Sequence, residues 1–299
     1  MNEIIKETTN HINLKEYAYK FLDYIDVSEN TIMTYKVGLK NFFGYLQESR
    51  IMMPSREDII AYREYLMANL KPTTANSYMI AVRNLFNYLE YEGITKNITK
   101  NIKGINVGNE HKRESLTKEQ CLDILKNVYD IREKVLFLLA TTCGIRANEL
   151  VNIRLEDFQQ KQGKICLYLL GKARDYKQDY VIVSDDVFEL IKKYIKEYQI
   201  TDYLFTSTSN NNTGGKLTTK TIRLIMKNMF RRIGLDSEKY SCHSCRHTFA
   251  TLSIQNGEDI REVSQALRHK QLNTTMIYLH DLERINNNCT NVVSNVLFN

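Results

Sequence analysis

The stretch SCHSCRHTFAT, Ser241 to Thr251, gathers cysteines, histidines and an arginine within three helical turns. Arranged as a helix, it has one apolar stripe made of Cys242, Cys245, Phe249 and Leu252. The adjacent face carries His243 and Arg246, which therefore project together. A thiol on an apolar stripe behaves as a small buried hydrophobe. The spacing thus predicts a helix with a core side and a basic side.

The Cys-x-x-Cys spacing has two alternative interpretations, a zinc site and a redox pair. A tetrahedral zinc site needs four ligands, usually from a second Cys or His pair. The other cysteines stand singly, at Cys121, Cys143, Cys166 and Cys289. A redox pair of the thioredoxin type follows a strand in a βαβ unit, whereas this stretch has a helical pattern. We therefore expect no metal, and we look for function on the basic side.

The composition is that of an ordinary globular protein of 299 residues, 43% hydrophobic and 25% charged. This length allows two domains, each with its own core. The N-terminus lacks the apolar core of a signal peptide, so we expect a cytoplasmic protein with reduced cysteines. The net charge of +6 is compatible with a nucleic-acid partner. No GxxxxGK[ST] phosphate loop is present, so nothing indicates nucleotide hydrolysis.

Residues from about 13 to 103 are predicted to be helical. Apolar positions in 30–46 fall on one face, and Ser28 or Asn30 can cap its start. Residues 54–70 form a second helix capped by Ser55, and residues 73–93 a third that stops at Gly93. We assign residues 1–105 to an N-terminal domain, 106–114 to a polar linker and 115–299 to a second domain.

The second domain is predicted to mix helices with a small sheet. Thr117 and Gln120 form a capping-box pattern, and residues 132–158 indicate two helices broken near Gly144. Residues 163–170 and 179–184 have the pattern of strands. Further helices are expected at 187–198, 221–235, 258–269 and 274–285.

His and Arg together on one helix face suit a phosphoryl group. In phosphoryl transfer, charge develops on the non-bridging oxygens, and guanidinium forks stabilise it without a metal. Such a site also needs a nucleophile, a group that accepts its proton and an acid for the leaving oxygen.

Four motifs resemble those of the tyrosine recombinase (phage-integrase) family. HSCRHTFAT resembles its H-x-L-R-H-[ST]-F-A-[ST] box, and ALRHKQLNTTMIYLH resembles its L-G-H-x-x-x-x-T-T-x-x-Y-x-H box. TTCGIRANELVNIRLED resembles the box of the first arginine, and GKARDYKQDYVIV resembles the β-hairpin that carries a lysine. The resemblance implies a mainly α fold, with a SAM-like core-binding domain and an α+β catalytic domain containing a small antiparallel sheet. The motifs and the helical N-terminal part together cover nearly the whole chain.

The resemblance also assigns the site residues. The catalytic residues it implies are Arg146, Lys172, His243, Arg246, His269 and the nucleophile Tyr278. Glu149 and His247 are expected to support them, His247 as a hydrogen-bonded structural histidine. Arg146 is expected to be buried, and Arg174 or Lys177 lies close enough to compete with Lys172 for its role. At Arg268 the family usually has glycine, which suits a helix cap. The arginine is expected to change the local geometry or to add a phosphate contact.

The partner implied is double-stranded DNA. The residues predicted to contact it are Lys36, Lys40, Lys71, Asn76, Arg83 and Arg268. By resemblance, cleavage proceeds through a 3′-phosphotyrosyl intermediate and a Holliday junction without cofactors, in a homotetramer assembled from free monomers on two sites.

The apolar tail, Val292 to Phe298, is expected to dock on a neighbouring protomer. A separate arm-site domain is not expected. A type IB topoisomerase, which relaxes DNA without exchange, and a DNA-binding module with a dead site remain as alternatives.

Overall fold

The computed structural model describes residues 13–108, 114–170, 177–207, 214–269, 271–272 and 275–276. The chain divides into two compact units, Met1–Glu110 and His111–Asn299. Their boundary lies within the polar stretch from which the sequence predicts a linker. Each unit has its own hydrophobic core.

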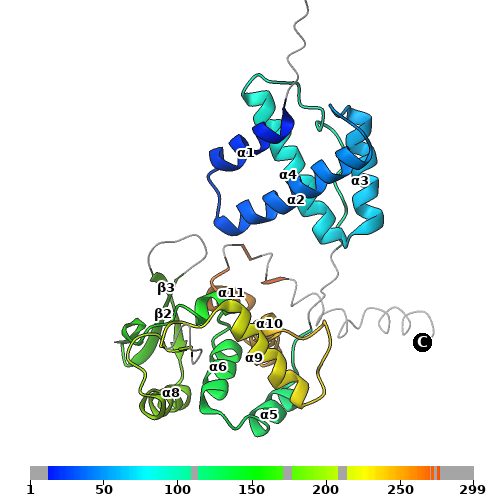
Figure 1. Cartoon of the computed structure of the whole chain (residues 1–299). Helices are drawn as coiled ribbons and strands as arrows, with labels where there is room; N and C mark the ends of the chain where they lie inside the picture. Colours follow the sequence, from blue (N-terminus) through cyan, green and yellow to red (C-terminus); the bar gives the residue numbers. More distant parts are fainter. Residues whose placement is uncertain are drawn as a thin grey trace, which may run out of the picture. The chain divides into compact units, whose positions relative to one another are not determined.

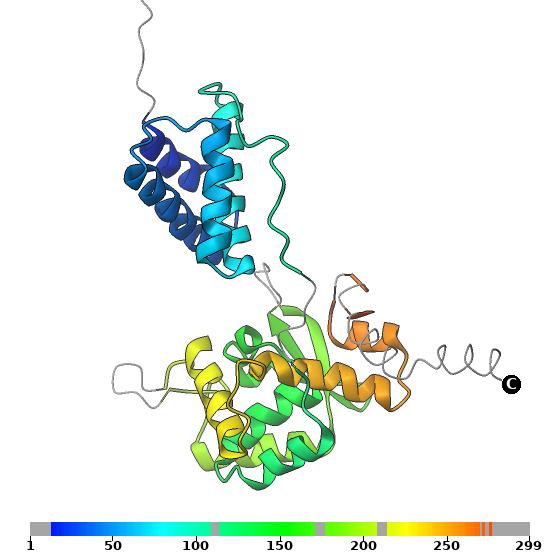
Figure 2. The same cartoon turned by 90° about the vertical axis from the view of Figure 1, so that its right-hand side faces the viewer.

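The first unit is a helical bundle. Its helices are α1 (Leu14–Tyr24), α2 (Glu29–Glu48), α3 (Arg56–Asn69) and α4 (Pro72–Tyr91). α2 packs along α4, α1 contacts both of them and α3 packs on α4 (Figures 1 and 2). The predicted helical N-terminal domain is confirmed.

The ends of these helices follow from local side chains. Ser28 accepts a hydrogen bond from the backbone N–H of Thr31 at the start of α2. At the start of α3, Ser55 and Asp58 form a reciprocal capping box. Beyond α4, Gly93 takes a φ of +70°, which glycine adopts without steric cost. The predicted caps at Ser28 and Ser55 and the stop at Gly93 are confirmed.

Arginines of α3 and α4 hold the chain that follows α4. Arg83 Nη2 donates to the Ile102 carbonyl at 2.6 Å, and Arg63 Nη1 donates to the Lys103 carbonyl at 3.2 Å. Arg56 bonds the carbonyls of Ile98 and Lys100. These contacts satisfy carbonyls outside any helix, and the sequence pattern does not reveal them.

The second unit contains the remaining elements. Its helices are α5 (Lys118–Lys126), α6 (Ile131–Thr142), α7 (Ala147–Leu150), α8 (Asp185–Tyr198), α9 (Thr219–Arg232), α10 (Cys242–Gln255) and α11 (Ile260–Ala266), with a 3₁₀ turn at Leu155–Asp157. α6 packs against α8, α9 and α10, and α11 packs on α10 (Figure 1). The break near Gly144 is confirmed, but the second predicted helix is only the four-residue α7, because the chain then forms the 3₁₀ turn and enters a strand at Phe158.

A three-stranded antiparallel sheet lies in this unit, in the order β1 (Phe158–Lys161), β2 (Lys164–Leu170) and β3 (Lys177–Val183). In its register Leu167 pairs with Val181, and both are buried. β2 and β3 match the predicted strands. β1 was not predicted, because its sequence FQQK has no apolar alternation and only pairing with β2 makes it a strand.

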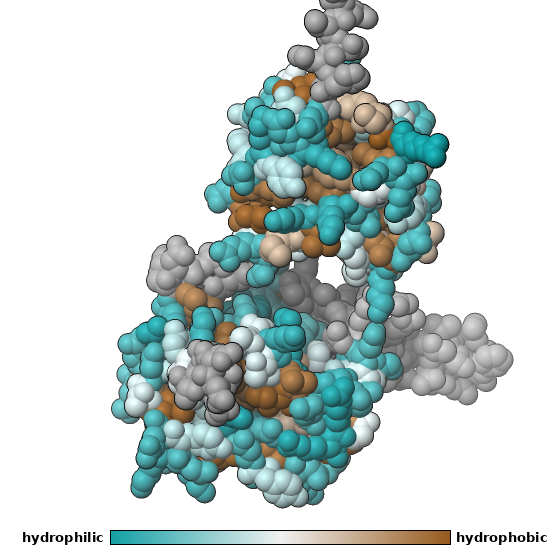
Figure 3. Space-filling view, viewed as in Figure 1, coloured by the Kyte–Doolittle hydropathy of each residue, from teal (hydrophilic) through white to brown (hydrophobic). Residues whose placement is uncertain are grey.

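The visible faces of both units are mostly hydrophilic, with smaller apolar areas among the polar side chains (Figure 3). Within the part of the chain that the structure describes, no helix is long and apolar enough to cross a bilayer.

Candidate active site

Helix α10 presents its cysteines to the core. Cys242 is 6% exposed and Cys245 is fully buried, and both belong to the main hydrophobic core of the unit. Burial raises the pKa of the Cys242 thiol to about 12, so it stays protonated at neutral pH. The interpretation of these cysteines as core residues is confirmed.

Arg246 on α10 joins two segments that are distant in sequence. Its Nη1 donates to the Gly144 carbonyl at 2.5 Å and its Nη2 bonds the Leu267 carbonyl. The residue is 1% exposed. Gly144 lies two residues before Arg146, and Leu267 lies two residues before His269. Arg246 therefore fixes both segments that carry the other predicted site residues.

His243 lies one turn from His247 on the same helix. Their rings are 4.5 Å apart between centroids and nearly perpendicular. His243 is exposed, whereas His247 is 7% exposed. The inner histidine thus packs against the exposed outer one.

Arg146 caps the short helix α7 together with Glu149. The Arg146 backbone N–H donates to Glu149 Oε2 at 2.8 Å, and its Nη1 donates to Glu149 Oε1 at 2.8 Å. The carboxylate is buried, while the arginine side chain is 33% exposed. Arg146 is therefore less buried than the sequence predicts.

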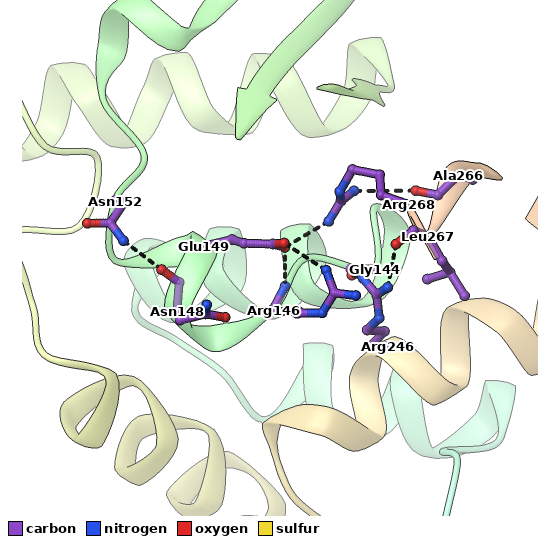
Figure 4. A network of polar contacts seen from close by, with 9 residues as sticks. All are labelled: Gly144, Arg146, Asn148, Glu149, Asn152, Arg246, Ala266, Leu267 and Arg268. Atoms are coloured by element: carbon purple, nitrogen blue, oxygen red, sulfur yellow. Dashed lines mark hydrogen bonds and ion pairs between the residues drawn. The ribbon is translucent and has the colours of Figure 1, made fainter. Parts of the chain in front are cut away.

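Arg268 follows helix α11 in a left-handed conformation, with a φ of +57°. Its N–H donates to the Gln265 carbonyl at 2.9 Å, and the next N–H, of His269, donates to the Ser264 carbonyl at 3.0 Å. This pair of bonds is a Schellman cap, in which glycine is the usual residue. The Arg268 guanidinium turns inward and donates to Glu149 Oε2 at 2.7 Å (Figure 4). With its side chain 7% exposed, it is not the surface contact expected of a DNA-binding residue.

His269 lies beside these arginines. Burial, followed by the charges of Arg246, Arg146, Arg268 and His243, lowers its pKa to about 4. Its Nδ1 is 2.7 Å from Oγ1 of the buried Thr275. At neutral pH the ring is therefore uncharged, and the threonine hydroxyl fixes its orientation.

The structure thus brings Arg146, His243, Arg246 and His269 together from three segments of the chain. Their charges and N–H groups make a site for an oxyanion, in which guanidinium groups offer several donors at once. The sequence did not reveal the Arg268–Glu149 ion pair, whose partners are 119 residues apart, or the Thr275 contact. No short-range spacing could have indicated either of them.

Lys172 and Tyr278 lie outside the described residues, as do Arg174 and the apolar tail. Lys177, a rival of Lys172 for the same role, forms an ion pair with Asp157 and donates to the Asn152 carbonyl at 3.1 Å. The Lys177 ammonium is thus held by the fold.

The residues of the first unit that are predicted to contact DNA differ in how deeply they are buried. Lys36 and Lys40 are exposed on α2 and line, with Lys15, a groove of about 400 Å³ between α1 and α2. Lys71 is exposed at the start of α4 and Asn76 is partly buried on it. Arg83 holds the Ile102 carbonyl, so its guanidinium also serves the fold. The contacts of these residues with DNA stay predictions.

Both units match known protein domains. Residues 114–284 match the phage integrase family, and residues 18–93 match the phage integrase N-terminal SAM-like domain. The sequence is 28% identical over 298 residues to the tyrosine recombinase XerC of Thermodesulfovibrio yellowstonii, covering 91% of this chain and 94% of that protein. It is also 28% identical over 279 residues to the tyrosine recombinase XerA of Pyrococcus horikoshii, covering 91% and 90% respectively.

Solved structures agree in fold. A XerH site-specific recombinase bound to palindromic difH substrate, in a post-cleavage complex, superimposes with a TM-score of 0.70 at 26% identity, over 85% of this chain and 78% of that one. A lambda integrase dimer bound to a COC′ core site gives a TM-score of 0.70 at 18% identity, over 89% and 75%, which shows the shared fold alone. The chain therefore belongs to the phage integrase family and is a site-specific tyrosine recombinase.

Proposed function

We propose that this recombinase cleaves and rejoins duplex DNA at this site, with Tyr278 as the nucleophile. The Tyr278 hydroxyl attacks a scissile phosphate, forms a 3′-phosphotyrosyl bond and releases a 5′-hydroxyl. The 5′-hydroxyl of a partner strand then attacks the phosphotyrosine and reverses the step. Two such rounds pass through a Holliday junction. The phosphodiester energy stays in the protein–DNA bond, so the reaction needs neither ATP nor a metal.

Each basic side chain of the site has its own role in this reaction. Arg146 and Arg246 stabilise the charge on the non-bridging oxygens in the pentavalent transition state. His269, whose pKa in the DNA-free protein is lowered to about 4, contributes a hydrogen bond from the nitrogen opposite Thr275. His243 accepts or relays the Tyr278 proton, and Lys172 protonates the leaving oxygen.

The observation that supports this proposal most is that three arginine charges act on the ring of His269. The charges of Arg146, Arg246 and Arg268 all act on its ring, although Arg146 lies 100 residues before Arg246 and 122 residues before Arg268 in the chain. Such a concentration of positive charge is costly unless an anion binds there. A phosphodiester is the anion that the family membership supplies.

The test is covalent capture on a nicked DNA substrate, in which the short cleaved strand diffuses away. The wild-type protein should accumulate a protein–DNA adduct that withstands denaturation. Tyr278→Phe should abolish the adduct, because the phenol oxygen is the attacking atom, and should leave duplex binding nearly unchanged. Tyr129→Phe, at an exposed tyrosine of the same unit, is the matched control and should react normally. Persistence of the adduct in Tyr278→Phe would remove this tyrosine from the mechanism.

The working assembly in this proposal is a homotetramer on two DNA sites, built from protein that is monomeric when free. A lambda integrase tetramer bound to a Holliday junction has the same fold, at 17% identity. The SAM-like unit would contact DNA through Lys36, Lys40 and Lys71. We place the protein in the cytoplasm, with the DNA of a mobile element or a replicon dimer as its substrate.

A further inference from the structure

We propose that Arg268 is a positioning residue of the cleavage site, which acts on Arg146 through the carboxylate of Glu149. This inference rests on the proposed function, because it explains how the proposed phosphate-binding arginine is held. Neither the motif resemblance nor the relatives assign such a role to this position.

The backbone at Arg268 is the first reason. The residue has a φ of +57° and completes the Schellman cap of α11, where a side chain is sterically unfavourable. Glycine would make the same backbone bonds without that cost. Strained non-glycine residues cluster at functional sites, but Gln199 also has a φ of +51° at the end of α8, so backbone conformation alone does not define a role. The reason for an arginine at this cap has to come from the contacts of its side chain.

The side-chain contacts show what that is. Glu149 Oε2 receives the Arg268 guanidinium at 2.7 Å and the Arg146 backbone N–H at 2.8 Å (Figure 4). Glu149 Oε1 receives Arg146 Nη1 at 2.8 Å. The second terminal nitrogen of the Arg268 guanidinium is also bonded, since Nη1 donates to the Ala266 carbonyl at 3.3 Å. One buried carboxylate thus lies between two arginines and orients both the backbone and the side chain of Arg146.

Charge balance explains why the second arginine matters. With Arg146 alone, the negative charge of Glu149 would offset the positive charge that a phosphate needs to meet. Arg268 supplies a second positive charge, so the three residues together keep a net charge of +1. The carboxylate can then orient Arg146 without cancelling its attraction for an anion.

Exposure separates the two arginines in role. The Arg146 side chain is 33% exposed, whereas that of Arg268 is 7% exposed and lies against Glu149. Of these two arginines, Arg146 has the more exposed side chain, whereas both terminal nitrogens of Arg268 donate within the fold, to Glu149 and to the Ala266 carbonyl. We therefore assign the phosphate contact of this pair to Arg146. Arg268 holds the Glu149 carboxylate that orients Arg146. It also adds to the positive charge around His269, together with Arg146, Arg246 and His243.

The test compares Arg268→Gly and Arg268→Lys with wild type in three measurements: adduct formation on nicked DNA, duplex affinity, and the pKa of His269 in the free protein by NMR. Arg268→Gly restores the residue that the cap favours, so the fold should be retained. We expect cleavage to slow by about 10- to 100-fold, because Arg146 loses its fixed position. Duplex affinity should fall far less than the cleavage rate, because only one of many phosphate contacts is affected, and the pKa of His269 should rise. Arg268→Lys keeps the positive charge but lacks the planar guanidinium. It should restore the pKa of His269 and part of the cleavage rate.

Arg261→Ala is the matched control, because it removes an exposed charge from the same helix and should change none of the three measurements. Wild-type cleavage and an unchanged pKa of His269 in Arg268→Gly would overturn the proposal. A parallel loss of duplex affinity with a weaker salt dependence would also overturn it, in favour of direct phosphate contact. If wild type itself formed no adduct, the proposed function would fail, while the NMR measurement would still report on Arg268.

Discussion

Arg246 is better described as the residue that assembles the site than as a surface cation. Its guanidinium bonds two backbone carbonyls, of Gly144 and Leu267, that precede the segments of Arg146 and His269. A guanidinium suits this task because its donors diverge within one rigid plane. The sequence predicts that Arg246 points to the same side as His243, but not that it is almost fully buried. Helical spacing gives the direction of a side chain, whereas burial depends on what packs over it.

The low pKa of His269 makes a prediction about acid stability. The ordinary pKa is 6.5 and the folded value is about 4, so between these pH values the unfolded chain binds more protons. The free energy of unfolding should therefore fall as the pH is lowered from about 6.5 towards 4. His269→Gln, which cannot take up that proton, should lose less stability over this interval than wild type.

Urea denaturation at a series of pH values measures this difference. The two proteins should give parallel curves above pH 7, where His269 is neutral in both the folded and the unfolded state. Equal losses of stability between pH 6.5 and 4 would contradict a lowered pKa at His269. The charges that surround the ring come from α10 and from the segments before α7 and after α11, so the effect depends on the assembled fold.

At the scale of elements, the turn between α6 and α7 fixes the site. Gly144 has a φ of +59°, and a Cβ added there would lie 2.6 Å from Leu267 Cδ2. The carbonyl of this glycine also receives Arg246. The turn thus lets the residue after α11 approach the end of α6 closely. The sequence predicts the break at Gly144 but not the neighbour that requires it, because Leu267 is distant in the chain.

We predict that Gly144→Ala destabilises the protein by more than the backbone cost alone. A left-handed conformation costs a non-glycine residue about 1–2 kcal/mol, and the contact with Leu267 adds an overpacking cost of about 1–3 kcal/mol. Gly163→Ala is the matched control, since Gly163 has a φ of +75° with nothing within 4 Å of an added Cβ. Urea unfolding should show the larger loss for Gly144→Ala. Equal losses would mean that the site tolerates the added methyl.

Elements with strong local signals agree with the structure best. The capping box of Thr117 and Gln120 begins α5 as expected, and the apolar stripe of α10 faces the core. β1 was missed because its four residues carry no pattern of their own. The ion pair of Lys177 with Asp157 likewise joins residues that only the folded sheet brings together. Helix caps and apolar stripes depend on neighbouring residues, so they can be predicted from sequence. Contacts between residues that are distant in the chain can be identified only in the folded structure.

At the scale of the whole molecule, the proposed function places several copies of the protein on two DNA sites. We propose that the tail docks on a neighbouring protomer, because its apolar run at Val292, Val293, Val296, Leu297 and Phe298 recurs at roughly helical spacing. The catalytic unit offers a pocket of about 610 Å³ between β3, α10 and α11, whose lining mixes apolar side chains such as Val181 and Phe249 with the charged side chains of Glu262 and Arg268. A pocket of this size can take apolar side chains from another chain.

Removing residues 288–299 should therefore leave binding to a single site intact but abolish assembly of the complex that holds two sites. Val296→Asp in the full-length chain should weaken the same assembly, because it places a charge within the apolar run of the tail, and docking would remove that charge from water. Asn295→Asp is the matched control, since it adds the same charge at a polar position next to Val296. Gel-shift titrations with one-site and two-site DNA separate binding from assembly. Normal two-site complexes from the truncated protein would show that the tail packs on its own domain, and the contacts between protomers would then have to come from the rest of the chain.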